Sequence, residues 1–281
     1  MNWRKITPAL LSLLVFLLAQ ALIPAVAFGI GTFVSPDFGT ALQKILNGET
    51  TDLPLFELMP IPMFSLTIMA TNIIAILICY RPLRYIRPIK ASDFGTIRWQ
   101  TGLLAIAGGI LGGFSLSIMT ENIALPDSMM QMSMAMSKSI WGLLALAIVG
   151  PITEELLFRE AIEGEMLRRK ASPWTAIIVS ALAFSIVHLN LAQGLYALPL
   201  GIMFGIIRYK TGNIILPSLL HILNNSIVAL QLCTLGEEMA DLSYAEMFGG
   251  NTAAQIAMLL SGMLSILLIK LFWNCHTPKA E

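Results

Sequence analysis

Charged residues are scarce in this sequence of 281 residues. Asp, Glu, Lys and Arg make up 12% of the chain, whereas hydrophobic residues make up 56% and the mean hydropathy is +0.77. Soluble domains carry about 25% charged residues, so the composition predicts an integral membrane protein that has the lipid bilayer as a partner. The formal net charge is zero, and nucleic-acid binding requires a basic surface. We therefore expect no nucleic-acid partner.

Cysteine is also rare. The three cysteines stand at positions 79, 233 and 275, and this number and spacing fit neither a disulfide framework nor a Cys-based metal cluster. Cys275 lies just past the last apolar run, where palmitoylation is conceivable, but an ordinary thiol is the simpler interpretation.

Long polar segments are lacking as well. The longest loops, near 32–60, 120–138 and 235–252, are too short to hold a core of their own. We therefore expect a single integral membrane domain over residues 1–281. The first apolar run is too long for a signal peptide and fits a membrane span of about 20 residues, so we expect it to remain as the first helix.

The sequence contains instead eight apolar runs that are long enough, or nearly long enough, to cross lipid. They cover residues 8–31, 61–80, 99–119, 139–158, 173–190, 194–208, 214–234 and 253–273. The predicted fold class is therefore all-α, a polytopic membrane helix bundle of about eight transmembrane helices.

The basic residues indicate an orientation for these spans. All Lys and Arg residues except Lys44 and Lys138 fall on one side of the predicted bundle. Because cytoplasmic loops carry the excess of Lys and Arg, both termini are predicted to be cytoplasmic. The acidic loop 235–252 then lies on the external side, which agrees with this assignment.

Few ionisable side chains lie within the predicted spans, and each is a candidate functional residue because a charge in lipid is costly. They are Glu154, Glu155 and Arg159 in the fourth span, His188 in the fifth and His221 in the seventh. For any one of them alone, a structural role is the simpler interpretation. Their presence together on three spans indicates a site, with a motif-bearing core over about residues 139–234.

Helical spacing relates the members of the fourth span. Glu155 and Arg159 are four residues apart, in the order that favours an ion pair on one helix face. Glu154 points about 100° away from Glu155. We therefore expect Arg159 to pair with Glu155, and Glu154 to face the bundle interior with His188 as its partner.

The seventh span offers an amide beside its histidine. Asn225 lies four residues after His221 and Asn224 lies three residues after it, so either amide can share a cavity with the imidazole. His221 with Asn225 is the preferred pair, and Asn224 remains open.

The fifth span raises a question of depth. Phe184 lies one turn before His188 and is expected to form an apolar wall beside the ring. Counted along its span, His188 lies nearer the outer face than Glu154. We therefore expect the hairpin tip 188–194 to be sunk into the protein, where a surrounding cavity tolerates irregular backbone.

This set of residues is suited to amide hydrolysis. A carboxylate and a histidine can hold and deprotonate a water molecule, and a second histidine with an amide can donate hydrogen bonds to a developing oxyanion. Zinc held by Glu154, His188 and His221 is an alternative, since three protein ligands plus water form a catalytic site, although an HExxH motif is missing. An acyl-enzyme is disfavoured because Ser185 and Ser226 lie nearby without forming a nucleophile motif.

Three short motifs follow one another on three of the spans. Residues 154–159 read EELLFR and match EExxxR, residues 184–188 read FSIVH and match FxxxH, and residues 221–225 read HILNN and match HxxxN. In these motifs and in its eight-helix layout, the chain resembles the CPBP family. This family comprises the type II CAAX prenyl endopeptidases and the bacterial bacteriocin-processing and self-immunity proteins.

The resemblance implies an intramembrane endopeptidase of the CAAX-protease type. It assigns Glu154 and His188 to the activation of water, and His221 and Asn225 to the stabilisation of the oxyanion. It assigns supporting roles to the remaining motif residues, which are Glu155, Arg159 and Phe184.

The resemblance also implies a membrane-associated peptide or protein as substrate and a bacterial cytoplasmic membrane as location. The compact chain favours an unprenylated substrate. The cofactor is left open, because a metal-independent glutamate mechanism and a zinc mechanism are equally compatible with the family.

Three rival interpretations use the same features. A transporter or channel also places ionisable residues at depth, but four of the eight spans are nearly free of charge. A catalytically silent scaffold or immunity protein of the same family would keep the fold without the activity. The methionines of residues 127–138 offer thioether sulfur to Cu(I), although an apolar segment on the bilayer surface is the simpler interpretation.

Overall fold

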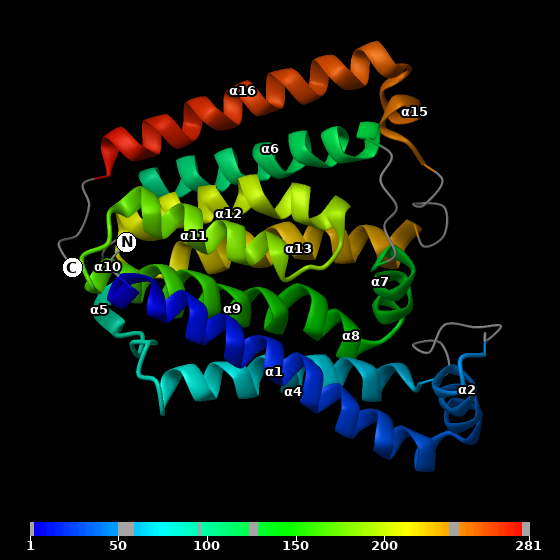
Figure 1. The fold of residues 1–281 in the computed structure, drawn as a ribbon. Coiled ribbons are helices and arrows are strands. Elements are labelled where there is room, and N and C mark those ends of the chain that lie inside the picture. The colour runs from blue at the N-terminus through cyan, green and yellow to red at the C-terminus, as the bar shows by residue number, and fades with distance from the viewer. Residues whose placement is uncertain (1–2, 50–58, 95–96, 124–128, 236–241, 277–281) are drawn as a thin grey trace.

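The protein is described by a computed structural model that covers residues 3–49, 59–94, 97–123, 129–235 and 242–276. Within these residues every regular element is a helix (Figure 1). This confirms the predicted fold class, a polytopic all-α membrane bundle.

Seven helices in the described chain are long and apolar enough to cross a bilayer. They are α1 (Trp3–Val34), α4 (Ile61–Tyr80), α6 (Trp99–Ile123), the continuous helix Ile140–Arg168, α12 (Leu191–Thr211), α13 (Ile215–Leu235) and α16 (Asn251–Cys275). The shorter helices are α2 (Pro36–Leu46), α5 (Ala91–Phe94), α7 (Met129–Ser137), α11 (Pro173–Ile186) and α15 (Tyr244–Phe248).

The predicted fifth span, 173–190, is wrong in length. Its helix α11 ends at Ile186 after 14 residues, which gives about 21 Å at 1.5 Å per residue against a hydrocarbon core of about 30 Å. The predicted sixth span is longer than expected, because α12 already begins at Leu191. The bundle therefore has seven long spans and one short apolar helix.

The helices form layers across the bundle (Figure 1). At one side α16 packs on α6, and at the other side α1 packs on α4, with α11, α12, α13 and the helix Ile140–Arg168 between them. Only 11% of the most apolar window of α1 is buried, against 44% in α12. The middle helices are therefore the core, and α1 and α16 present most of their surface to lipid.

The described chain ends lie on one side of the bundle. The start of α1 and the end of α16 are at the same end in Figure 1. This arrangement agrees with two termini on the same side of the membrane, and the cytoplasmic assignment of that side stays a prediction.

The helix Ile140–Arg168 changes its hydrogen bonding around the paired glutamates. It is built from α8 (Ile140–Leu144), η1 (Ala145–Val149), α9 (Gly150–Glu154), η2 (Glu155–Gly164) and α10 (Glu165–Arg168). The segments η1 and η2 are π-helical, and such widened turns, which are frequent at functional sites, change the direction in which side chains point. The two glutamates lie at the junction of α9 and η2.

A tight hairpin joins α11 to α12. The side chain of Ser172 accepts a hydrogen bond from the Thr175 amide at the start of α11, and that of Asn190 accepts one from the Gln193 amide at the start of α12. These are ordinary N-caps that satisfy otherwise unpaired backbone donors. They set His188 in the four-residue connection between the two helices.

Candidate active site

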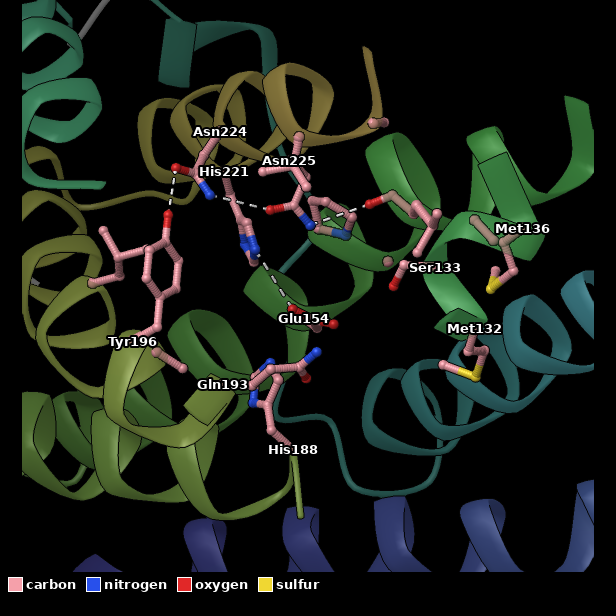
Figure 2. Close-up of a pocket in the computed structure, with 18 of the residues that line it drawn as sticks. Met132, Ser133, Met136, Glu154, His188, Gln193, Tyr196, His221, Asn224 and Asn225 are labelled. Atoms are coloured by element: carbon pink, nitrogen blue, oxygen red, sulfur yellow. Dashed lines mark hydrogen bonds and ion pairs between the residues drawn. The ribbon is translucent and has the colours of Figure 1, made fainter. Parts of the chain in front are cut away.

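A cavity of about 450 Å³ opens in the middle of the bundle. It is lined by residues of α4, α6, α7, α11, α12, α13 and the helix Ile140–Arg168, including the four predicted catalytic residues Glu154, His188, His221 and Asn225. Figure 2 shows the polar side chains of α12 and α13 on one side of this cavity and methionines of α7 on the other. The three motifs therefore meet in one pocket.

The two glutamates meet the same histidine. Glu155 Oε1 lies 3.0 Å from His221 Nδ1. On the cavity side, Glu154 Oε2 lies 3.6 Å from His221 Nε2 (Figure 2). The Glu155 side chain is fully buried, whereas 25% of the Glu154 side chain is exposed. Glu155 therefore holds the ring from inside the protein, and Glu154 faces the cavity.

The expected ion pair between Glu155 and Arg159 is present. Arg159 Nε lies 3.3 Å from Glu155 Oε2, and neither side chain is exposed. Arg159 Nη2 donates to the carbonyl oxygen of Gly201 at 3.4 Å, and its guanidinium carbon lies 4.5 Å from the ring centre of Phe184. A charge buried this deeply costs several kcal/mol unless it is paired, so Arg159 and Glu155 depend on each other.

The predicted fourth span, 139–158, is too short, because it ends just before Arg159. The helix continues for nine residues to Arg168, so Arg159 lies inside the protein. Arg208, one of the basic residues that indicated the orientation, is fully buried and pairs with Glu160 at 3.2 Å. The sequence argument missed Glu160 because the predicted span stopped at residue 158.

His188 does not pair with Glu154 as expected. The structure instead places His221 beside Glu154, and His188 Nδ1 lies 2.7 Å from the carbonyl oxygen of Phe184. A carbonyl oxygen can only accept, so Nδ1 carries the hydrogen, and Nε2 of the neutral ring is an acceptor. His188 still lines the same cavity as Glu154.

The hairpin tip is not sunk into the protein, which corrects a second expectation. Leu189, next to His188, is 87% exposed. His188 reaches the cavity because α11 is short, and not because the tip is buried. Phe184 packs edge-on against both histidine rings, at 4.9 Å from His188 and 5.8 Å from His221, so it forms the expected apolar wall.

Asn225 is held by a backbone carbonyl of η1. Its Nδ2 donates to the carbonyl oxygen of Leu146 at 3.1 Å. In an α-helix the Leu146 carbonyl would accept from the Gly150 amide, but that amide donates to the carbonyl of Ala145. In a π-helix it would accept from residue 151, but Pro151 has no N–H. Asn225 thus satisfies a carbonyl that the π-helical turn leaves without a helical donor.

This bond fixes the orientation of a chain of polar groups. Because Asn225 Nδ2 faces Leu146, its Oδ1 accepts from Asn224 Nδ2 at 3.4 Å, and Asn224 Oδ1 accepts from the Tyr196 hydroxyl at 3.0 Å (Figure 2). A Cβ on Gly113 would lie 2.6 Å from Asn224 Oδ1. Asn224 therefore supports Asn225, and Gly113 makes room for it.

Tyr196 and Gln193 are pocket residues that sequence reasoning missed. They lie on α12, three residues apart and therefore on one helix face. The only signal in the sequence was a polar pair in an apolar run, and nothing in that pattern connected it to the three motifs.

The methionine segment also belongs to this cavity. Met132, Ser133 and Met136 of α7 line it opposite the histidines (Figure 2), so this part of α7 does not simply lie on the bilayer surface. A Cβ on Gly142 would collide with the carbonyl oxygen of Met136. Glycine at this position therefore allows α7 to pack closely against α8. The result is an apolar wall facing a polar one.

The residues suggested for zinc do not fit a metal ion in this geometry. Among the described residues, no group of three His, Cys, Asp or Glu side chains is placed to hold one. The chemical roles at this site are therefore assigned to protein side chains.

Comparison with known proteins gives partial matches. A protein-family model, Type II CAAX prenyl endopeptidase Rce1-like, matches residues 136–227. The putative membrane peptidase YdiL of Bacillus subtilis (strain 168) is 34% identical over 84 residues, which are 30% of this chain and 34% of that protein. The chain thus matches about a third of the length of this curated relative. No solved structure matches the chain significantly.

The matched stretch contains the three motifs and most of the polar wall of the cavity. Over residues 136–227, the chain is therefore similar to the type II CAAX prenyl endopeptidases, the group that its motifs resemble.

Proposed function

We propose that this protein is an intramembrane endopeptidase that hydrolyses a peptide bond of a membrane-associated protein or peptide by a metal-independent, glutamate-dependent mechanism. The observation that carries the proposal is the placement of Glu154. Its carboxylate faces the cavity, while the buried Arg159–Glu155 pair holds His221 directly beside it.

Glu154 is the proposed general base. It takes a proton from a water molecule as the water oxygen bonds to the carbonyl carbon of the substrate, and it later gives that proton to the amine when the carbon–nitrogen bond breaks. His188 Nε2, an acceptor in the neutral ring because Nδ1 faces Phe184, orients the water. General acid–base catalysis of this kind contributes about 10²–10⁴-fold to the rate.

The proposed oxyanion donors are His221 and Asn225. Glu155 accepts the Nδ1 hydrogen of His221, and Nε2, when it also carries a proton, points an N–H toward Glu154 and the cavity. Asn225 Nδ2 has two hydrogens, of which Leu146 receives one, so the other can serve the oxyanion. Loss of one such donor costs about 10²–10³ in kcat.

The lining of the cavity supports a peptide substrate. The polar wall matches the needs of an amide group, and the methionines of α7 offer an adaptable apolar surface to a side chain. We place the protein in a bacterial cytoplasmic membrane, with an unprenylated substrate, in line with its bacterial relative.

The test is the appearance of new N-termini in membranes. Cells producing the full chain are compared with cells producing Glu154→Gln, His188→Ala or His221→Ala. Glu49→Gln is the control, because Glu49 is exposed and lies far from the cavity residues in the sequence. We expect cleavage products with the unchanged chain and the control, and a loss of about 100-fold or more in the three site variants. Products that are equal in all five membranes, or absent from all of them, would overturn the proposal.

A further inference from the structure

A second cavity lies on the lipid-facing side of the bundle and shares one lining residue, Leu200, with the cavity of the proposed active site. It is a groove of about 570 Å³ between α6, α11, α12 and α16. Its walls are almost entirely apolar, with Leu116, Met203 and Ile266 among them, and Gly262 lies at one end. Trp174, Lys270 and Trp273 lie at the other end.

The length of the groove matches one leaflet of a bilayer. Gly262 and Trp273 are 11 residues apart on α16, which gives about 16 Å at 1.5 Å per residue. This is close to half of a hydrocarbon core of about 30 Å. The apolar walls therefore fit a single acyl chain that runs from the membrane surface to the middle of the bilayer.

The surface end of the groove carries a buried cation. Lys210 is only 6% exposed, and its ammonium nitrogen lies 3.9 Å from the ring centre of Trp273. Within the described part of the chain, no carboxylate lies within ion-pair distance of this ammonium group. A buried charge is stable only when it is paired, and contact with an aromatic ring and a helix C-terminus supplies only part of that stabilisation.

Two further cations lie at this end of the groove. Lys270 lines it, and Arg98 immediately precedes α6. Burial and, after it, the positive charges of Lys210 and Arg98 lower the pKa of the neighbouring His276. Both cations therefore lie near this histidine. The surface end of the groove is therefore a positively charged site.

In the part of the chain that the structure describes, the helices of the groove supply few counter-charges there. The four helices α6, α11, α12 and α16 contain one carboxylate between them, Glu121, which lies at the opposite end of α6. The buried Glu160 pairs with Arg208, and Arg208 lies about 200° around α12 from Lys210. Within the described residues, none of these four helices brings a carboxylate to the cations of the groove, so an external anion fits there.

Aromatic residues give the groove the character of a membrane interface. Trp273 stacks on Trp174 at 6.1 Å and on Tyr209 at 5.9 Å, and Trp and Tyr concentrate at the level of lipid headgroups. Basic pockets between membrane helices on the cytoplasmic side bind anionic headgroups. The groove combines both features with an apolar channel one leaflet long.

We propose that this groove is a binding site for one anionic phospholipid, whose phosphate pairs with Lys210 and Lys270 and whose acyl chain lies along α16. Charge complementarity selects the headgroup, and the apolar walls hold the chain. None of the residues that hold the lipid is a proposed catalytic residue, so the site does not depend on the proposed peptidase activity.

The test compares two lipids that differ only in headgroup charge. The full chain is purified in a mild detergent and titrated with phosphatidylglycerol or phosphatidylcholine of identical acyl chains, and bound lipid is counted by native mass spectrometry. We expect one phosphatidylglycerol to be retained and to raise the apparent Tm, and phosphatidylcholine to be retained weakly. Lys210→Met should weaken phosphatidylglycerol binding at least about fivefold, the contribution of one basic residue near an anionic surface.

Three further variants make the result decisive. Lys44→Met removes an exposed lysine of α2 and should change nothing. Lys270→Gln, at an exposed position, repeats the charge test if Lys210→Met does not fold. Ile266 is 71% exposed in the groove wall. The substitution Ile266→Trp should therefore block the acyl chain and lower the retention of both lipids. Equal binding of the two lipids, or phosphatidylglycerol binding that is unchanged in both lysine variants, would overturn the proposal.

Discussion

The buried pair of Glu155 and Arg159 yields a quantitative prediction about stability. Both side chains are fully buried, their charged atoms are 3.3 Å apart, and the Arg159 guanidinium also rests on Phe184 at 4.5 Å. Removing one partner of such a pair leaves an unpaired buried charge, at a cost of about 3–5 kcal/mol. Arg159→Met and Glu155→Gln should each lower the free energy of unfolding by about that amount.

The double variant separates this explanation from a simple loss of packing. Arg159→Met removes the charge and keeps much of the side-chain volume, and Glu155→Gln keeps an oxygen that can accept from His221. With both charges gone, the double variant should be more stable than the sum of the single effects predicts, by about 2 kcal/mol or more.

The assay is unfolding of the purified chain in mixed micelles by titration with a denaturing detergent. A partly exposed pair at the end of the same helix provides the control, because Glu165 and Arg169 are also four apart, at 2.8 Å, but are 15% and 30% exposed. Its coupling should be at most about 1 kcal/mol. Single effects of Glu155→Gln and Arg159→Met that add within about 0.5 kcal/mol would refute the reasoning.

Three further predictions concern the surroundings of the site. Tyr196→Phe removes the hydroxyl that donates to Asn224, so kcat should fall about tenfold or more through misplacement of the oxyanion donor, with KM nearly unchanged; an effect on KM alone would contradict this role. Gly142→Ala places a methyl group against the backbone of α7, so it should lower the free energy of unfolding by about 1–3 kcal/mol, as an unfolding titration can show. It should also lower peptidase activity in a cleavage assay, because it displaces the apolar wall of the cavity. His276 should titrate below its usual pKa of about 6.5, because burial and the charge of Lys210 disfavour its protonation. The unfolded chain then binds a proton at His276 more tightly than the folded chain does, so the free energy of unfolding should fall as the pH drops from the usual pKa toward the lowered pKa. NMR of labelled histidine should show the lowered pKa, and Lys210→Met should bring it closer to the usual value.

Local rules of spacing predicted much of the site correctly. The pairing of Glu155 with Arg159 follows from a separation of four residues on one helix, and the apolar wall of Phe184 follows from its position one turn before His188. Both contacts lie within one short stretch of chain. The positions of most spans were also predictable, because a run of apolar residues has to be about 20 residues long to cross a bilayer, but the lengths of the fifth and sixth were not.

The partner of Glu154 was not predictable in this way. His188 and His221 lie 34 and 67 residues further along the chain, and which imidazole meets the carboxylate depends on the depth and direction of α11 and α13. The early end of α11 and the widened turns of η1 and η2 decided this. A hydropathy pattern contains no information about either feature.

The sequence by itself determined the membrane location, the helical class and the similarity of residues 136–227 to the type II CAAX prenyl endopeptidases, because hydrophobic runs and short motifs are properties of local sequence. The tertiary structure decided that Glu154 faces the cavity beside His221, that Asn224 and Tyr196 orient Asn225, and that α7 closes the opposite wall. It also placed an unmatched cation, Lys210, at the end of an apolar groove. These relations join residues far apart in the chain, and only the packing of the helices brings their side chains within a few ångströms of one another.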